Sequence, residues 1–200
     1  MDCYIARRQK GYPLFTIVSD AFNRAFGYLG NADTGQAWLS SGAATSKWTV
    51  SSNVAKRDNS TNLNTDVAYI DCGKSDVIVS ADVVMSSATG SFLVARMSGA
   101  SFADSMSAYL EKTGQVAVRK TIGGSATLLG LTTFAYTIGS TINCMFTCFG
   151  NDFKIYIDGV LKVSVTDDNA LKTNTKCGMH IPFAGPPYSN DWFDNFLVKG

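Results

Sequence analysis

Apolar and polar positions alternate through much of the segment 141–167. Phe153, Ile155 and Ile157 fall on every second position, and the same pattern resumes after Asp158-Gly159. A period of two puts one set of side chains on a buried face and the other in contact with water. Asp-Gly between two such runs is typical of a tight hairpin turn, because that turn needs positive φ at its central residues. With a further turn at 150–152, the segment predicts three antiparallel strands in a row.

This meander has one apolar face, which a second sheet from the rest of the chain must cover. Shorter apolar or alternating runs predict the remaining strands, beginning with an edge strand at 14–18. The segment 103–112 fits a helical stripe as well as a strand, and the strand is favoured because a turn and a hairpin partner follow it. Trp38 and Trp48 are expected to anchor the core. The other expected strands are 47–54, 67–72, 76–85, 92–97, 115–121 and 176–181, and a loop is expected at 182–191.

The acidic residues support an all-β chain. Glu111 is the only glutamate among the 16 acidic residues, and the chain has 18 glycines. Helical surfaces use Glu freely, whereas Asp and Gly favour turns and the ends of strands. A length of 200 residues without internal repeats or linkers suits a single β-sandwich domain. We expect an N-terminal arm at 1–13, which carries three basic residues, and one domain at 14–200.

Charge and cysteine usage narrow the class of protein. The formal net charge of +1 gives no reason to expect nucleic acid as a partner. No run is long and apolar enough for a signal peptide or for insertion into a membrane. The 5 cysteines are odd in number and match no zinc spacing, so we interpret them as buried free thiols of a chain made in a reducing compartment. They are Cys3, Cys72, Cys144, Cys148 and Cys177.

A family resemblance rests on the segment 20–38, which reads DAFNRAFGYLGNADTGQAW. It is similar to a motif of concanavalin A-like and laminin-G-like jelly-roll domains, D-x-F-N-R-A-x-G-x-L-G-x-A-D-T-G-Q-A-W. Phe26 stands where the family often has an acidic residue. The resemblance extends over about residues 20–199 and includes the closing segment 191–198. It implies a two-sheet antiparallel β-sandwich whose last strand returns beside the first, a fold found in many bacteriophage structural and tail proteins.

The same fold hosts glucanases, but we expect no enzyme here. A retaining glycosidase needs two carboxyl groups roughly 5 Å apart. Glu111 alone cannot form the E-x-D-x-x-E pattern of jelly-roll glucanases, and Asp76 and Asp82 share a strand without the close spacing. His180 is the only histidine and no G-x-S-x-G motif is present, so it is interpreted as structural. The scarcity of histidine also argues against a transition-metal site.

Calcium is the one cofactor that the resemblance suggests. Lectin-like jelly rolls often bind it through Asp, Asn and backbone carbonyl oxygens, which suit a hard cation. Asp20 and Asp194 are expected on neighbouring strands if the two ends of the domain pair. The alternative is that both carboxylates hydrogen-bond to backbone amides at corners.

Glycan binding is the function that we expect. Jelly-roll sandwiches present a sheet face and a rim of loops, where sugars stack on aromatic rings beside a few polar groups. Three neighbouring strands would supply Arg96, Tyr109 and Arg119, and the loop near the C-terminus would supply Tyr188 and Trp192. The alternative for the two arginines is ion pairing with Asp on a solvated face.

In the phage context that the resemblance implies, the chain would be a surface module of the virion. It would be a decoration protein or a tail or fibre adhesin that recognises host-surface carbohydrate, made in the host cytoplasm. Two alternatives stay open at this point. The chain would be purely architectural, binding other virion subunits through 1–13 or associating with copies of itself, or it would be a carbohydrate-binding module of a bacterial enzyme system.

Overall fold

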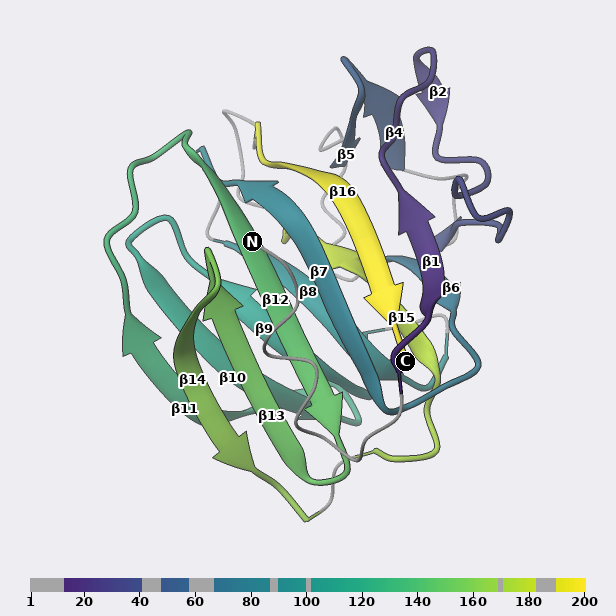
Figure 1. Cartoon of the computed structure of the whole chain (residues 1–200). Helices are drawn as coiled ribbons and strands as arrows, with labels where there is room; N and C mark the ends of the chain where they lie inside the picture. The colour runs from purple at the N-terminus through teal and green to yellow at the C-terminus, as the bar shows by residue number, and fades with distance from the viewer. Residues whose placement is uncertain are drawn as a thin grey trace.

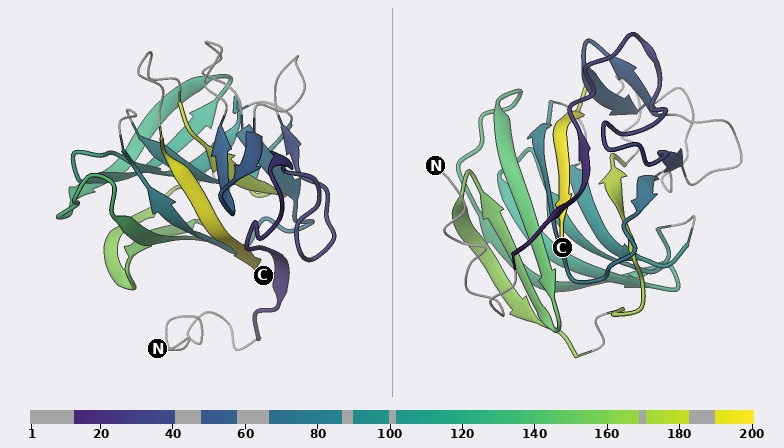
Figure 2. Two further views of the ribbon diagram at one scale, coloured as in Figure 1. Left: turned by 90° about the horizontal axis from the view of Figure 1, so that it is seen from above. Right: turned by 45° about the vertical axis from the view of Figure 1, so that its right-hand side comes forward.

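The computed structural model describes residues 13–40, 48–57, 67–86, 90–99, 102–168, 171–182 and 190–200. Every regular element in this part of the chain is a β-strand. The strands form two antiparallel sheets, one in front of the other in Figure 1 and stacked as two layers when seen from above in Figure 2. The fold is therefore the two-sheet antiparallel sandwich that the sequence predicts. Apart from Pro13, the expected arm lies outside the described residues.

The first sheet has nine strands in the order β14-β13-β12-β7-β16-β5-β4-β2, with β1 also paired to β16. It holds β1 (Thr16–Asp20), β2 (Gly27–Tyr28), β4 (Trp48–Ser51), β5 (Val54–Arg57), β7 (Val77–Val84), β12 (Thr141–Phe149), β13 (Asp152–Ile157), β14 (Val160–Thr166) and β16 (Trp192–Lys199).

The second sheet has seven strands in the order β11-β10-β9-β8-β15-β6-β3. It holds β3 (Leu39–Ser40), β6 (Val67–Asp71), β8 (Ser91–Met97), β9 (Ser105–Leu110), β10 (Gln115–Ile122), β11 (Ser125–Thr133) and β15 (Lys176–His180).

The central meander and the closure of the sandwich follow the prediction. β12, β13 and β14 pair in sequence, and Asp158 and Gly159 have φ of 50° and 78°, as a turn with two left-handed residues requires. The ambiguous segment is strand β9, because it pairs antiparallel with β10 along its length. β16 lies beside β1, so the last strand closes the sheet against the first.

Apart from the two-residue strands β2 and β3, two strands were not anticipated. β11 follows Gly123-Gly124, where the sequence analysis expects only a break in the chain. The expected single strand at 47–54 is the first half of a hairpin, because Ser52 and Asn53 adopt φ of 56° and 59° and turn the chain into β5.

The core lies between the sheets and is built from alternate positions of their strands. Trp48 is fully buried and Trp38 is 8% exposed, so both belong to the core as expected. The thiols of Cys72, Cys144, Cys148 and Cys177 are buried and free, which confirms the interpretation for the described cysteines. Burial raises the pKa of the Cys144 thiol, so that it stays neutral and packs as a small apolar side chain.

Candidate functional site

The outer face of the seven-stranded sheet, turned away from the core, carries two of the residues that the sequence analysis selected. Register places Tyr109 opposite Ala117, Ser107 opposite Arg119, and Ser105 opposite Thr121 on β9 and β10. Opposite residues of an antiparallel pair share a face. Met106, Ala108, Val116 and Val118, at the intervening positions, are buried in the core between the sheets. Tyr109 and Arg119 are thus brought together on one outer surface, as predicted.

Arg119 and Tyr109 form a stacked pair on this surface. The guanidinium carbon of Arg119 lies 3.6 Å from the centre of the Tyr109 ring and 5.9 Å from that of Phe92. The Tyr109 hydroxyl hydrogen-bonds to the carboxylate of Glu111. Burial, and then this bond, raise the pKa of Tyr109 above its usual range, so the phenol stays neutral. The pair therefore places a cation over a neutral aromatic ring.

Three hydroxyl groups beside the stacked pair have no hydrogen-bond partner among the described residues. They are the side chains of Ser105, Ser107 and Thr121, and all three are at most 3% exposed. A buried hydroxyl without a partner costs about 1–3 kcal/mol, and such groups are rare in folded proteins. Three of them in two adjacent cross-strand pairs form a row of polar atoms that lack a hydrogen-bond partner. We call this row together with Tyr109 and Arg119 the β9–β10 face.

Aromatic rings continue the surface toward β8 and β15. The Phe92 ring lies 4.6 Å from the Tyr109 ring and 5.2 Å from the imidazole of His180, between ring centres. Phe102 stacks on the same imidazole at 5.0 Å. His180 is 2% exposed in β15, as a histidine that packs within the structure would be. The rings support one end of the β9–β10 face.

Arg96 does not belong to this surface, so its expected placement beside Tyr109 and Arg119 was wrong. It is fully buried, and its guanidinium donates to the backbone oxygens of Ser75 and Gly150 and to Asp76, each at 2.9 Å. A β-bulge explains the error. Val94 and Met97 pair with residues two apart on β15, so β8 contains one extra residue there. Arg96 has φ of 50°, and its side chain turns away from the outer face.

The two residues selected from the C-terminal region do not join the β9–β10 face either. Trp192 starts β16 in the other sheet, and its neighbour Phe193 points into the core, where its ring lies 6.1 Å from that of Trp48. Side chains alternate along a strand, so Trp192 lies on the outer face of the nine-stranded sheet, on the opposite side of the sandwich. Tyr188 lies outside the described residues.

The predicted calcium ligand Asp20 already has partners for both carboxylate oxygens. It accepts hydrogen bonds from the two terminal nitrogens of Arg24 at 2.8 and 2.7 Å, from the Trp38 indole at 2.7 Å and from the Phe22 amide at 2.9 Å. A cation would have to displace the bidentate arginine. The alternative, in which Asp20 organises a corner by hydrogen bonding, fits these contacts.

Asp194 lies near other acidic groups without forming a calcium cage. Burial, with the charges of Asp82 and Asp20, raises the pKa of Asp194 above its usual value. The carboxylate of Asp82 accepts hydrogen bonds from the amides of Asn143 and Asn195 at 2.8 Å each. Within the described residues, no group of three or more His, Cys, Asp or Glu side chains is placed to hold a metal ion.

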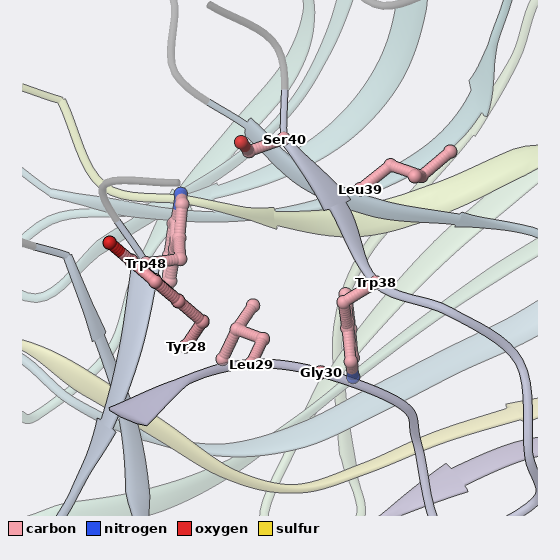
Figure 3. A pocket seen from close by; sticks show the side chains of 7 residues that line it. All are labelled: Tyr28, Leu29, Gly30, Trp38, Leu39, Ser40 and Trp48. Atoms are coloured by element: carbon pink, nitrogen blue, oxygen red, sulfur yellow. The ribbon is translucent and has the colours of Figure 1, made fainter. Parts of the chain in front are cut away.

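The corner built on Asp20 also shapes a pocket at the opposite end of the sandwich from β11 and β14. Its volume is about 320 Å³, and Figure 3 shows its side chains around an open centre. Tyr28 and Leu39 are exposed at 66% and 50%, whereas Trp38 and Trp48 are buried. The lining residues carry no charge and are Tyr28, Leu29, Gly30, Trp38, Leu39, Ser40 and Trp48. Six of these seven come from the segment 28–40. Part of the sequence motif at 20–38 therefore forms the wall of this pocket.

Sequence reasoning missed the row of hydroxyls. The signal was present, because alternation in β9 places Ser105 and Ser107 on the same face as Tyr109. Their small size and burial make them inconspicuous in a sequence rich in serine and threonine. Only the absence of partners for their oxygens distinguishes them from other small polar residues.

Comparison with known proteins extends the description of the fold. No protein-family model and no curated protein matches the chain. A solved structure of carbohydrate-binding module CBM66 from Bacillus subtilis is similar, with 15% identity, a TM-score of 0.60, and 82% of this chain and 95% of that chain covered. The β-glucanase of Bacillus licheniformis is similar at 15% identity and a TM-score of 0.55, with 96% and 99% covered.

A third similar structure is the CBM2 module of the evolved Dit of Lactobacillus casei BL23 phage J-1. It has 11% identity and a TM-score of 0.55, with 92% of this chain and 94% of that chain covered. At such identities the likeness establishes the jelly-roll fold alone. In the described part of the chain, no helix has the length and apolar character needed to cross a membrane.

Proposed function

We propose that this chain is a non-catalytic carbohydrate-recognition module that binds a glycan on the β9–β10 face. The observation that carries the proposal is the row formed by Ser105, Ser107 and Thr121 beside the Arg119–Tyr109 pair, whose hydroxyls find no partner in the described part of the chain. A sugar offers many hydroxyl groups that donate and accept hydrogen bonds, together with an apolar face of C–H groups. A sugar that displaces the side chains covering the row can therefore satisfy the orphaned oxygens.

Arg119 has a defined part in this proposal. Its guanidinium carries five N–H donors in a planar arrangement, and its contact with the Tyr109 ring positions it before a ligand arrives. A preorganised donor loses less conformational freedom on binding than a free side chain would. Arg119 therefore orients the sugar through its hydroxyl oxygens, and the serines accept or donate the remaining bonds.

The residues of this face argue against hydrolysis. The outward positions of β8, β9 and β10 hold no Asp or Glu in the described residues, whereas glycosidases work with a pair of carboxyl groups. Glu111, the only glutamate, bonds to the hydroxyls of Tyr109 and Thr113. The face has groups that bind a sugar and lacks the pair of carboxyl groups that hydrolysis needs.

The names of the similar structures agree with this proposal. Two of them are carbohydrate-binding modules, one from Bacillus subtilis and one from a phage Dit protein. Together with the resemblance of the segment 20–38 to domains of phage structural proteins, they favour a place on the virion surface, as a decoration or tail-fibre module that recognises host carbohydrate. A carbohydrate-binding module of a bacterial enzyme system is the second candidate, favoured by the likeness to the Bacillus subtilis module.

The test begins with a glycan array probed with the full chain. The best ligand is then titrated calorimetrically against wild type and the Arg119→Met variant. Loss of a hydrogen bond to a charged donor costs about 1.5–3 kcal/mol, so affinity should fall by roughly 10- to 150-fold. Ser107→Ala should weaken binding by a smaller factor. Lys154→Met is the matched control, since Lys154 lies on β13 in the other sheet, and it should leave affinity unchanged.

Three results would contradict the proposal. They are an array without a bound glycan, an Arg119→Met variant with unchanged affinity, and release of shortened sugars from the bound polysaccharide. Loss of binding in Tyr28→Ala with retention in Arg119→Met would move the site to the pocket of Figure 3. Antibody labelling of phage particles separates the virion role from the bacterial one, because only a virion module lies on the particle surface.

A further inference from the structure

The edge of the seven-stranded sheet at β11 is long, exposed and uncharged. Leu128 and Leu131 are 53% and 50% exposed, and within the described residues no strand pairs with the outer side of β11. The segment 121–151 contains no Asp, Glu, Lys or Arg. An edge strand presents a row of unpaired backbone N–H and C=O groups, and proteins usually protect such an edge with charge, proline or short length.

The other edges among the described strands have such protection. β1, which pairs only with β16, has 5 residues and ends at Asp20. β3 and β2, at the far ends of the sheets, have 2 residues each. β14, which lies beside β11 in Figure 1, contains Lys162. The contrast identifies β11, with 9 residues, as the one long edge in the described strands that lacks both kinds of protection.

We propose that β11 pairs with β11 of a second copy of this chain, in antiparallel orientation about a two-fold axis. The lack of charge favours a second copy, because self-pairing then brings no like charges together, and a partner of opposite charge finds nothing to attract it. The opposite edge of the sheet is β3, which is too short to pair again. Association therefore closes at the dimer and does not continue into a fibre.

The bulge in β11 selects one register. Val118 pairs with Gly130 and Arg119 pairs with Leu128, so Leu129 is the extra residue. The bulge shifts the alternation, and Leu128 and Leu131 both face outward with Arg119 and Ala117. An axis between Leu129 and Gly130 places Leu128 opposite the partner's Leu131. That register keeps outward residues opposite outward residues on both sides of the bulge and groups four exposed leucines.

The arrangement has a consequence for binding. Pairing within one sheet keeps both outer faces on the same side, so the two β9–β10 faces of a dimer would point in one direction. Two sites on one side allow simultaneous contact with a surface that carries many glycans, which strengthens attachment by avidity. The dimer itself stands on the geometry of β11 and does not depend on what the β9–β10 face binds.

Sedimentation velocity of the full chain over a range of concentrations tests the proposal. Wild type is expected to have the mass of two chains, and Leu128→Lys the mass of one. Leu128→Lys/Leu131→Glu should restore the dimer, because the proposed register sets each new lysine opposite the partner's new glutamate. Leu161→Lys is the matched control, since Leu161 is 49% exposed on β14, and it should remain a dimer.

A wild type that stays monomeric at every concentration would overturn the proposal, and so would a Leu128→Lys variant that stays dimeric. Failure of the double variant to recover the dimer would overturn the register and with it the isologous pairing. Larger oligomers would contradict closure at two chains. Far-ultraviolet circular dichroism verifies that each variant keeps its strands, which the exposure of both leucines leads us to expect.

Discussion

Replacement of Arg96 by methionine tests whether this residue holds the two sheets together. Its guanidinium lies inside the protein and bonds to the backbone oxygens of Ser75 and Gly150 and to the Asp76 carboxylate. The same group lies 5.1 Å above the ring of Phe153 in the facing sheet. Arg96→Met keeps most of the apolar stem, so it removes these interactions with little change in volume.

The expected loss can be estimated contact by contact. Each hydrogen bond from a charged donor to a carbonyl is worth about 1.5–3 kcal/mol. The Asp76 side chain is 55% exposed, so the ion pair adds only about 0–1 kcal/mol. Relief of the buried charge offsets part of the total. We expect a net loss near 3 kcal/mol, which for a protein of this size lowers Tm by roughly 6–12 °C.

Urea and thermal unfolding, followed by circular dichroism, measure this loss. Arg119→Met is the control, because Arg119 stacks on the outer face and its removal should cost no more than about 1 kcal/mol. Equal stability of Arg96→Met and wild type would refute the structural role of Arg96. A loss of glycan binding in Arg96→Met without a loss of stability would return this residue to the ligand site.

Three further substitutions follow from the described contacts. Asp20→Asn should destabilise the protein by about 2 kcal/mol because it weakens the hydrogen bonds from Arg24 and Trp38. Calcium should leave the Tm of wild type unchanged. A calcium-dependent rise in Tm would contradict the interpretation of Asp20 as a hydrogen-bonded corner. Asp194→Asn should stabilise the protein by well under about 1 kcal/mol at neutral pH, which raises the Tm slightly. It should have no effect at a pH well below 3.8, the ordinary pKa of an aspartate. The pKa of Asp194 is raised in the folded protein, so its charged form opposes folding only as the pH rises through that folded-state pKa. A gain in Tm that does not depend on pH would contradict the role of the Asp194 charge. Gly178→Ala should cost about 2–3 kcal/mol in urea unfolding, because its Cβ would lie 2.0 Å from the backbone oxygen of Ala68, and a neutral result would mean that β6 and β15 can separate locally.

The sequence predicted most of the fold because alternation in period two survives wherever a strand has one buried face. It failed where a bulge changes the alternation. Phe92, Val94 and Arg96 follow one another at every second position, so an uninterrupted strand would place all three outward. The extra residue in β8 turns Arg96 inward. β11 escaped notice for a related reason, since its exposed edge and its bulge at Leu129 leave no regular apolar pattern.

The candidate site was partly accessible from the sequence. Tyr109 and Arg119 were found because their strands are strongly patterned and adjacent. The hydroxyls of Ser105, Ser107 and Thr121 were not found, because a sequence reveals neither burial nor the absence of a hydrogen-bond partner. The partners of Asp20 were not predicted, because Arg24 and Trp38 belong to a corner whose geometry only the folded chain defines.

The most direct test of glycan recognition at the β9–β10 face is a titration of the isotope-labelled chain with the best array ligand, followed by amide NMR. Saturable shifts centred on Ser107, Tyr109 and Arg119, with the ligand recovered intact, are the predicted result. Shifts centred on Tyr28 and Leu39, or on the outer face of the nine-stranded sheet, would contradict the account, and so would a spectrum that no glycan changes.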